Sequence, residues 1–313
     1  MFLLHADHAA DNVISEFLHT SLGTFGHFLD EVILHGLYET AILIPFLFLT
    51  YLLMEYIEHT ASDKVRSVMT RAGTLGPLIG GLAGAAPQCG FSASAANLYT
   101  GRVITLGTLV AVFISTSDEM IPILVAGNIG IDKVLLIVVY KIVAAIIAGF
   151  AVDLVMRILG RSKGEINIDE ICEEDGCHCE DGVLKSAIHH TVSVSLWCFG
   201  VIVLLNAVVF FVGEDLIGAL IVDIPVLSHL ICSLIGLVPN CAASVALSRL
   251  AIGGFITVGE MISGLSSAAG IGLFVLFKMN KKIRENLVIV AIIVGFGVLF
   301  GVVADLIPFF TLS

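Results

Sequence analysis

Charged residues are scarce in this chain, and basic residues are the scarcest. Only 13% of its 313 residues are charged, whereas a soluble domain usually has about 25%. Against 27 Asp and Glu stand 15 Lys and Arg, a net charge of −12, so no basic surface is expected and nucleic acid is excluded as a partner. With 58% hydrophobic residues and a mean hydropathy of +1.03, the composition predicts an all-α polytopic membrane protein.

The sequence also lacks several motifs that would indicate secretion, nucleotide binding or catalysis. The N-terminus has no basic stretch followed by a long apolar core, so no cleavable signal peptide is expected. The nucleotide-binding pattern G-x-x-x-x-G-K-[ST] is missing, so ATP would have to come from another chain. No nucleophile and base stand at a readable spacing, and we therefore expect no enzyme. Seven cysteines are an odd number, and disulfides explain them poorly.

Apolar windows of about 20 residues predict the membrane spans. Four windows are plain and cover residues 36–57, 134–156, 187–212 and 286–309. Two longer apolar tracts, 73–127 and 225–277, are interrupted by Gly, Pro and polar residues. Each tract is expected to hold about three spans, some of them broken, which gives about ten transmembrane helices.

Basic residues in short loops predict the orientation, because such loops stay in the cytoplasm. The loop after the first span contains Lys64, Arg66 and Arg71, and the loop after residues 134–156 contains Arg157, Arg161 and Lys163. The loop before the last span contains Lys278, Lys281, Lys282 and Arg284. We therefore expect a multi-pass protein of the cell (inner) membrane with its N-terminus outside. Residues 1–30 are interpreted as an extracytoplasmic amphipathic segment.

An internal repeat organises the rest of the chain. A shift of 152 residues aligns Pro87–Cys89 with Pro239–Cys241, Gly107 with Gly259 and Asp153 with Asp305. It predicts two transmembrane repeats, 31–156 and 183–313, joined by a cytoplasmic linker, 157–182. Because each repeat would cross the membrane five times, the two would have inverted topology, as in secondary transporters. Repeated membrane helices without transport are the alternative.

Each repeat carries proline, an amide and cysteine where a continuous helix would be expected. Proline breaks the helical hydrogen bonds, and lipid cannot satisfy the freed carbonyls. We therefore predict one central ion site lined from both repeats. Its expected ligands are Gln88, Cys89, Ser92, Asn97, Asn240, Cys241 and Ser244. Kinked helices in which small residues only permit close packing are the alternative.

Carboxylates within apolar stretches extend this prediction. A carboxylate in a span costs several kcal/mol unless it is protonated, paired or ligating a cation. The carboxylates Asp118, Glu119 and Glu260 are therefore expected to bind an ion or a proton, and Ser117, next to the first two, is expected to join them. For the pair 118–119, a position at the end of a short helix near the outer interface is the alternative.

Several other ionisable residues have expected roles. Glu39, His189 and His190 are interpreted as a proton relay, with solvated interfacial side chains as the alternative. Lys141 lies within a plain span, and Asp153 is expected to pair with Arg157, one helical turn away. Arg102 and Arg249 are expected to snorkel or to pair with the carboxylates named above.

The linker is the only markedly polar segment. It places Cys172, Cys177, His178 and Cys179 among acidic residues. Three thiols and an imidazole suit zinc or another soft metal, and thiols stay reduced in the cytoplasm. We predict metal capture or sensing there, with an acidic solvated linker as the alternative.

The motifs resemble a family of ten-span heavy-metal exporters, whose members are labelled arsenic efflux proteins or manganese transporters. The likeness rests on PQCGFSASAANLY (Pro87–Tyr99), TSDEMIPIL (Thr116–Leu124), GLVPNCAASVAL (Gly236–Leu247) and the CxxxxCHC linker, and it covers nearly the whole chain. The resemblance implies the fold and the transport class, without specifying the ion.

The combined prediction is a secondary active, proton-coupled exporter of a metal or metalloid ion. Manganese or another divalent metal is favoured because oxygen ligands outnumber the two thiols, while the thiols favour softer ions. An arsenite or organoarsenical permease, an ion channel and, last, a membrane enzyme using Cys89 or His190 are the alternatives. The expected partners are the ion, protons and the lipid bilayer, with a homodimer left open. No cofactor is expected beyond a linker-bound metal.

Overall fold

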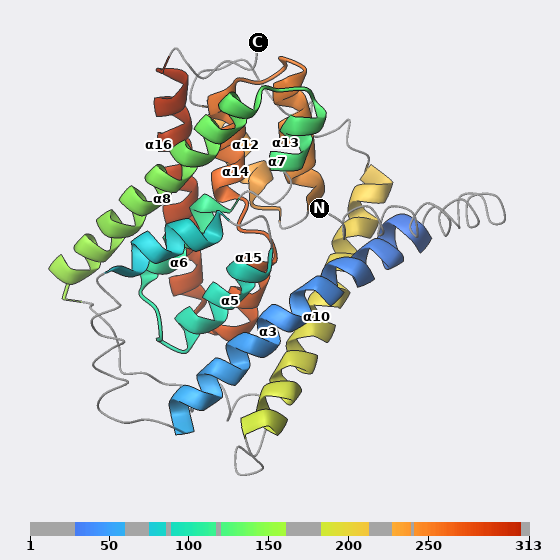
Figure 1. Cartoon of the computed structure of the whole chain (residues 1–313), viewed down its shortest axis with the longest axis vertical. Helices are drawn as coiled ribbons and strands as arrows, with labels where there is room; N and C mark the ends of the chain where they lie inside the picture. Colours follow the sequence, from blue (N-terminus) through green and yellow to red (C-terminus); the bar gives the residue numbers. More distant parts are fainter. Residues whose placement is uncertain are drawn as a thin grey trace.

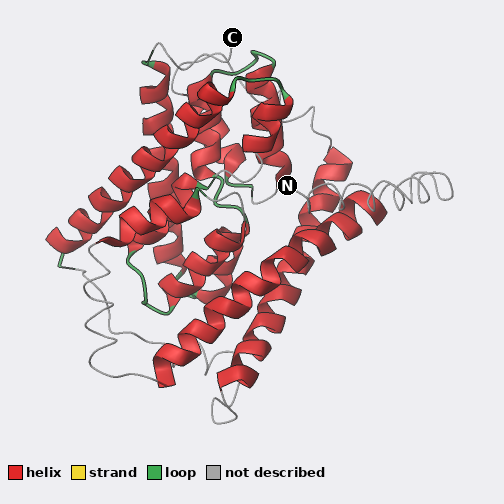
Figure 2. Cartoon of the chain, viewed as in Figure 1, coloured by secondary structure: helices red, strands yellow, loops and turns green. Residues whose placement is uncertain are grey.

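The computed structural model describes residues 29–59, 75–85, 89–116, 120–160, 183–212, 227–238 and 241–307. Within these ranges every regular element is a helix, which confirms the all-α prediction (Figure 2). Six helical stretches are long and apolar enough to cross a membrane, as expected of a membrane protein: Val32–Leu52, Leu106–Ala126, Ile131–Ile158, Ala187–Leu204, Val258–Met279 and Ile283–Asp305.

Four long helices occupy the four plain apolar windows. They are α3 (His35–His59), α8 (Ile131–Ile158), α10 (Val183–Val212) and α16 (Ile283–Asp305), and a short π-helical turn, η1 (Leu29–Leu34), precedes α3. Helix α3 packs along α10, the two run side by side along one flank of the molecule in Figure 1, and α3 also packs on α5 (Cys89–Thr100).

The two interrupted tracts fold into short helices. The first contains the helix Leu75–Gly84, then α5 (Cys89–Thr100), α6 (Leu106–Ser115) and α7 (Met120–Ala126). The second contains α12 (Leu227–Gly236), α13 (Cys241–Ile252), α14 (Val258–Ser267) and α15 (Ile271–Met279). At about 1.5 Å of rise per residue, none of these helices alone crosses a hydrocarbon core of about 30 Å.

The predicted breaks at Pro87 and Pro239 lie outside the described residues, and the described helices end on either side of them. One helix ends at Gly84 and the next begins at Cys89; in the second half the corresponding residues are Gly236 and Cys241. A second interruption in each half separates α6 from α7 and α14 from α15. At the latter, Gly270 has a φ of +54°, which L side chains rarely adopt.

Helix bounds in the two halves follow the 152-residue shift. Leu75–Gly84 becomes Leu227–Gly236, Cys89–Thr100 becomes Cys241–Ile252, and Leu106–Ser115 becomes Val258–Ser267, at both ends of each helix. The turn after α5 is repeated as well. Val103 N donates to Leu98 O at 2.8 Å, and Phe255 N donates to Leu250 O at 3.0 Å.

Short helices of one half pack against short helices of the other half. Within each half, α6 packs on α8 and α14 packs on α16. Across the halves, α5 packs on α15 and α13 packs on α7 (Figure 1). The α5–α15 contact is tight, because a Cβ at Gly272 would lie 2.6 Å from the Ser92 carbonyl carbon.

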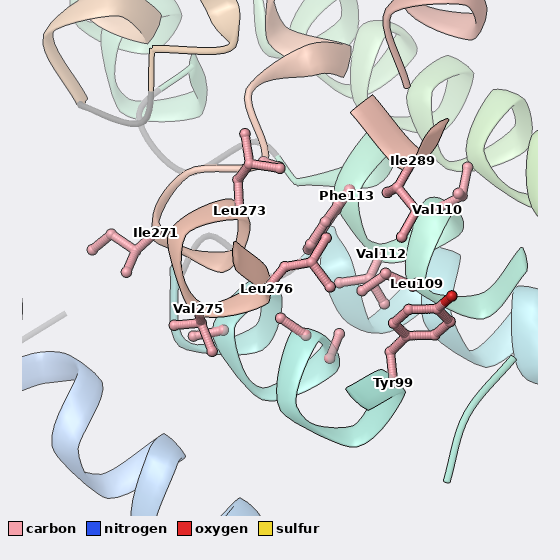
Figure 3. Close-up of a cluster of buried hydrophobic side chains, with 14 of the residues drawn as sticks. Tyr99, Leu109, Val110, Val112, Phe113, Ile271, Leu273, Val275, Leu276 and Ile289 are labelled. Atoms are coloured by element: carbon pink, nitrogen blue, oxygen red, sulfur yellow. The ribbon is translucent and has the colours of Figure 1, made fainter. Parts of the chain in front are cut away.

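The larger hydrophobic cluster forms where these helices meet. It takes Tyr99 from α5, Leu109 and Phe113 from α6, Leu276 from α15 and Ile289 from α16 (Figure 3). Because these residues come from both halves, burial of this cluster holds the halves together.

Candidate functional site

Helix α8 has an apolar outer face and a partly charged inner face. Leu135, Val139 and Val143 are about half exposed, as expected of side chains that meet lipid. Lys141 and Asp153, by contrast, are 1% and 8% exposed. Large apolar groups outside and ionisable groups inside are the arrangement of a membrane protein with an internal polar site.

Lys141 lies between the C-terminal ends of two short helices. Its Nζ donates to the carbonyl of Thr116, the C-cap residue of α6, at 2.5 Å. It also donates to the carbonyl of Leu265, in the last turn of α14, at 3.1 Å. The last carbonyls of a helix have no intrahelical donor and carry partial negative charge. The ammonium therefore joins the two halves at the place where α6 and α14 end.

A second polar cluster lies among α3, α5, α10 and α15. The Tyr51 hydroxyl lies 3.2 Å from Asn97 Oδ1 and 3.8 Å from Met279 Sδ, and its ring stacks on the buried His190 at a centroid distance of 5.3 Å. Asn97 is fully buried, and its Nδ2 has no hydrogen-bond partner among the described residues. An unpaired buried amide is costly, so this group is a candidate donor to a ligand.

The first turns of α6 and α14 are held by equivalent carboxylates. Asp153 accepts from Thr105 Oγ1 at 2.8 Å and from Gly107 N at 2.9 Å. Asp305 accepts from Thr257 Oγ1 at 2.6 Å and from Gly259 N at 2.8 Å. The sequence predicted Arg157 as the partner of Asp153. The contacts that the structure shows give this carboxylate a capping role.

The second half carries additional ionisable groups at this position. His229 Nε2 lies 3.2 Å from Asp305 Oδ2. Glu260 accepts Thr257 N at 2.8 Å in a capping box and also accepts the Ser228 hydroxyl. Gly76, Pro77 and Thr108 stand at the equivalent positions of the first half. Glu260 therefore has a structural role at the start of α14.

Arg102 pairs with a carboxylate that the sequence did not suggest. Its guanidinium binds Glu285 of α16 at 2.9 and 3.3 Å, and the Tyr99 hydroxyl donates to the same carboxylate. This group fastens the turn after α5 to the start of α16.

The expected site residues are described to different extents. Gln88, Ser117, Asp118, Glu119, Asn240 and the linker residues Cys172, Cys177, His178 and Cys179 lie outside the described residues, as do residues 1–28 of the N-terminal segment. Cys89 and Cys241 are the first residues of α5 and α13, and Glu39 lies in α3, with only their backbones described.

The remaining expected residues lie on described helices. Ser92 and Asn97 are buried on α5, and Ser244 is buried on α13. His190 is buried on α10, whereas His189 is exposed beside it, with 6.2 Å between ring centroids. Within the described part of the chain, no group of three His, Cys, Asp or Glu residues could hold a metal ion.

Sequence reasoning missed Tyr51 and His229, and it assigned no partner to Lys141. Tyr51 lies inside a plain apolar span, and His229 has Pro77 as its repeat equivalent. Lys141 and His229 are ionisable, whereas their repeat equivalents, Ile293 and Pro77, are not. This asymmetry was the sequence signal that could have marked both residues as functional candidates.

No family model, curated protein or solved structure matches this chain.

Proposed function

We propose that this chain is a secondary active transporter, a proton-coupled exporter of a metal or metalloid ion, with manganese or another divalent metal favoured. The observation that carries the proposal is the burial of Lys141 between the ends of two short helices, one from each half. Helices that stop inside the apolar layer are tolerated only around a protein-lined or wet site. In transporters built from repeats, such ends surround the substrate and the coupling ions.

The proposed topology is ten spans arranged as two inverted repeats of five. Its support is the 152-residue correspondence of the short helices and of the Asp153 and Asp305 contacts. The packing of short helices across the halves, α5 with α15 and α13 with α7, also fits two halves related by a pseudo-two-fold axis. Basic loops on one side supply the orientation, with the N-terminus outside.

The proposed ion site lies at the breaks that precede α5 and α13. Gln88, Cys89, Asn240 and Cys241 would supply amides and thiols, and Asp118 and Glu119 would supply carboxylates. Buried Ser92, Asn97 and Ser244 on the adjoining helices support a polar interior there. Glu260 is the weakest member of the proposed set, because both of its oxygens already accept hydrogen bonds at the start of α14.

The proposed proton path runs along α3 and α10. His190 is buried and stacks on Tyr51, whose hydroxyl reaches Asn97. This chain of contacts links an imidazole, a side chain that can both donate and accept a proton, to the helix that begins at Cys89. Glu39 would extend the path along α3, and the exposed His189 would connect it to water.

Ion flux into proteoliposomes tests the proposal directly. Manganese, zinc, cadmium, iron and arsenite are compared with and without an imposed pH gradient, using wild type, Asp118→Asn/Glu119→Gln and Cys89→Ser/Cys241→Ser. Gradient-dependent manganese flux that needs the carboxylates supports the proposal. Soft-ion flux that needs the thiols transfers the site to the cysteines, and the arsenical permease then becomes the better assignment.

A matched control tests whether the loss of any carboxylate from this chain lowers flux. Asp132 is exposed in the first turn of α8, so Asp132→Asn should leave flux unchanged. Flux that is independent of the gradient would favour an ion channel. If no ion in the panel moves, the metal-exporter proposal is wrong.

A further inference from the structure

We propose that the Lys141 ammonium is a tethered cation that fills a monovalent-cation site formed by the carbonyl ends of α6 and α14. Transport by this chain would then need no dissolved sodium or potassium. The inference rests on the proposed function only where transport is the readout, because occupancy of the site by the ammonium is a property of the folded protein itself.

The surroundings of the ammonium are those of a cation site. Two backbone carbonyls accept hydrogen bonds from it, from residues 25 and 124 positions away in the chain. Both carbonyls belong to helix ends, where the aligned peptide dipoles place negative charge. Broken helices in transporters coordinate sodium through carbonyls of this kind.

The repeat supplies a comparison for this site. Position 293 of α16 corresponds to Lys141 of α8, and Ile293 there is fully buried in an apolar environment. One repeat therefore places an aliphatic side chain where the other places a long cationic one. Isoleucine fills the buried space at position 293 without a charge. Burial of a charge at the corresponding position 141 therefore requires a reason other than packing.

The charge of the ammonium indicates the ion that would replace it. A lysine side chain delivers one positive charge and up to three N–H donors to surrounding oxygens. If the side chain is shortened, the two carbonyls lose their donor at a buried position, which is costly. A small alkali cation restores one positive charge and is coordinated by the same oxygens, as carbonyl groups do in ion-selective sites.

The test is the thermal stability of the purified protein in matched chloride salts of sodium, potassium and choline, with manganese as a fourth arm. We expect Lys141→Ala to have a lowered melting temperature in choline. Sodium or potassium should raise it by about 5–10 °C at roughly 100 times the dissociation constant. Wild type should show no difference among the three monovalent salts.

Two variants serve as controls. Lys141→Met fills most of the side-chain volume without a charge, and we expect it to gain no selective stability from sodium or potassium. Ile293→Ala removes a fully buried side chain at the equivalent position, and it should be destabilised equally in all salts. Equal recovery of Lys141→Ala and Ile293→Ala by sodium would overturn the proposal.

The remaining outcomes also decide the question. If Lys141→Ala can be recovered folded in sodium or potassium but not in choline, the proposal is supported. Failure to recover it in any of the salts, or recovery by manganese alone, overturns it. In proteoliposomes, wild-type metal flux should be equal in choline, sodium and potassium, and a requirement for either alkali ion overturns the proposal. If no metal is transported at all, the proposed function fails while the stability comparison still stands.

Discussion

The carboxylate of Asp153 accepts the hydroxyl of Thr105 across the contact between α8 and α6, with 2.8 Å between Oδ2 and Oγ1. The same contact recurs 152 residues later between Asp305 and Thr257. In each half, the carboxylate near the end of one long helix thus caps a short helix that stops inside the protein. Caps of this kind fix the start of the short helix and thereby the position of its other end, where the Lys141 contacts lie.

Replacing Asp153 by asparagine should destabilise the folded protein. The substituted side chain would keep one acceptor oxygen but would present an amide NH₂ where the carboxylate now accepts a hydrogen bond. Because bonds to a charged acceptor contribute about 1.5–3 kcal/mol, we expect a loss of that order. Asp305→Asn should cost less, since its side chain is 27% exposed. Denaturant unfolding in detergent, with exposed Asp132→Asn as control, measures the difference. Equal stability of Asp153→Asn and Asp132→Asn would contradict the capping role.

The glycines beside these caps should not tolerate a methyl group. A Cβ at Gly107 would overlap the carbonyl oxygen of Gly149, and one at Gly259 would overlap that of Gly301. Both contacts involve backbone, so neither side of the contact can rotate away. We expect Gly107→Ala and Gly259→Ala each to cost about 1–3 kcal/mol or more.

Gly295→Ala is the matched control for these two substitutions. Gly295 lies in α16, and a Cβ there would meet nothing within 4 Å. Alanine is favoured over glycine in a helix by about 1 kcal/mol, so this variant should be unchanged or more stable. Thermal melts of the three variants compare them directly. A destabilised Gly295→Ala would show that glycine serves another purpose in these helices.

Arg102 combines an ion pair with an unfavourable backbone conformation. Its φ is +58°, and the repeat-equivalent Gly254 has a φ of +74°. Arg102→Ala and Arg102→Gly both remove the pair with Glu285, but only glycine also relieves the left-handed conformation. We therefore expect Arg102→Gly to be the more stable of the two by about 1 kcal/mol. Gly254→Ala should cost a similar amount, because a Cβ there meets no neighbour. Identical unfolding of the two Arg102 variants would refute the strain argument.

The sequence predicts where the helices of this molecule begin and end better than it predicts their tertiary contacts. Proline and glycine at matched positions break helices through local chemistry, so the ends at Cys89 and Cys241 follow from the chain itself. The acceptors of Lys141 are backbone carbonyls, which leave no residue-type pattern in a sequence. The pair Arg102–Glu285 joins residues 183 positions apart, so it depends on how the halves pack. Nothing local distinguished Glu285 from Asp118 or Glu119 as its partner.

The same limit applies to the polar cluster on α3 and α5. Tyr51 sits in an apolar span and looks like an interfacial or packing residue. Only the folded chain brings its hydroxyl to Asn97 and its ring to His190. Asn97, by contrast, was predicted as a site residue in the polar tract that follows Pro87, and its Nδ2, which has no described partner, makes that prediction testable.

Asn97→Ala should impair transport more than folding. Removal of the Asn97 Nδ2, a buried donor without a described acceptor, costs the folded protein little. Removal of Oδ1 costs the one hydrogen bond from Tyr51, while a bound ion's ligand or water would lose a partner. We expect ion flux to fall about 10-fold or more, by analogy with groups that support a metal site. Tyr51→Phe removes the hydroxyl that reaches Asn97 Oδ1, and a loss of about 2–10-fold is expected for one hydrogen bond.

Asn286→Ala provides the contrast that makes this result interpretable. Asn286 is also fully buried, but its Nδ2 donates to the Asn280 carbonyl at 2.7 Å. Its removal should lower the melting temperature and leave the concentration dependence of flux unchanged. Flux measured against ion concentration, together with melting curves for all three variants, separates the two behaviours. If Asn97→Ala and Asn286→Ala lose stability and flux in the same proportion, Asn97 is a packing residue and is removed from the proposed ion site.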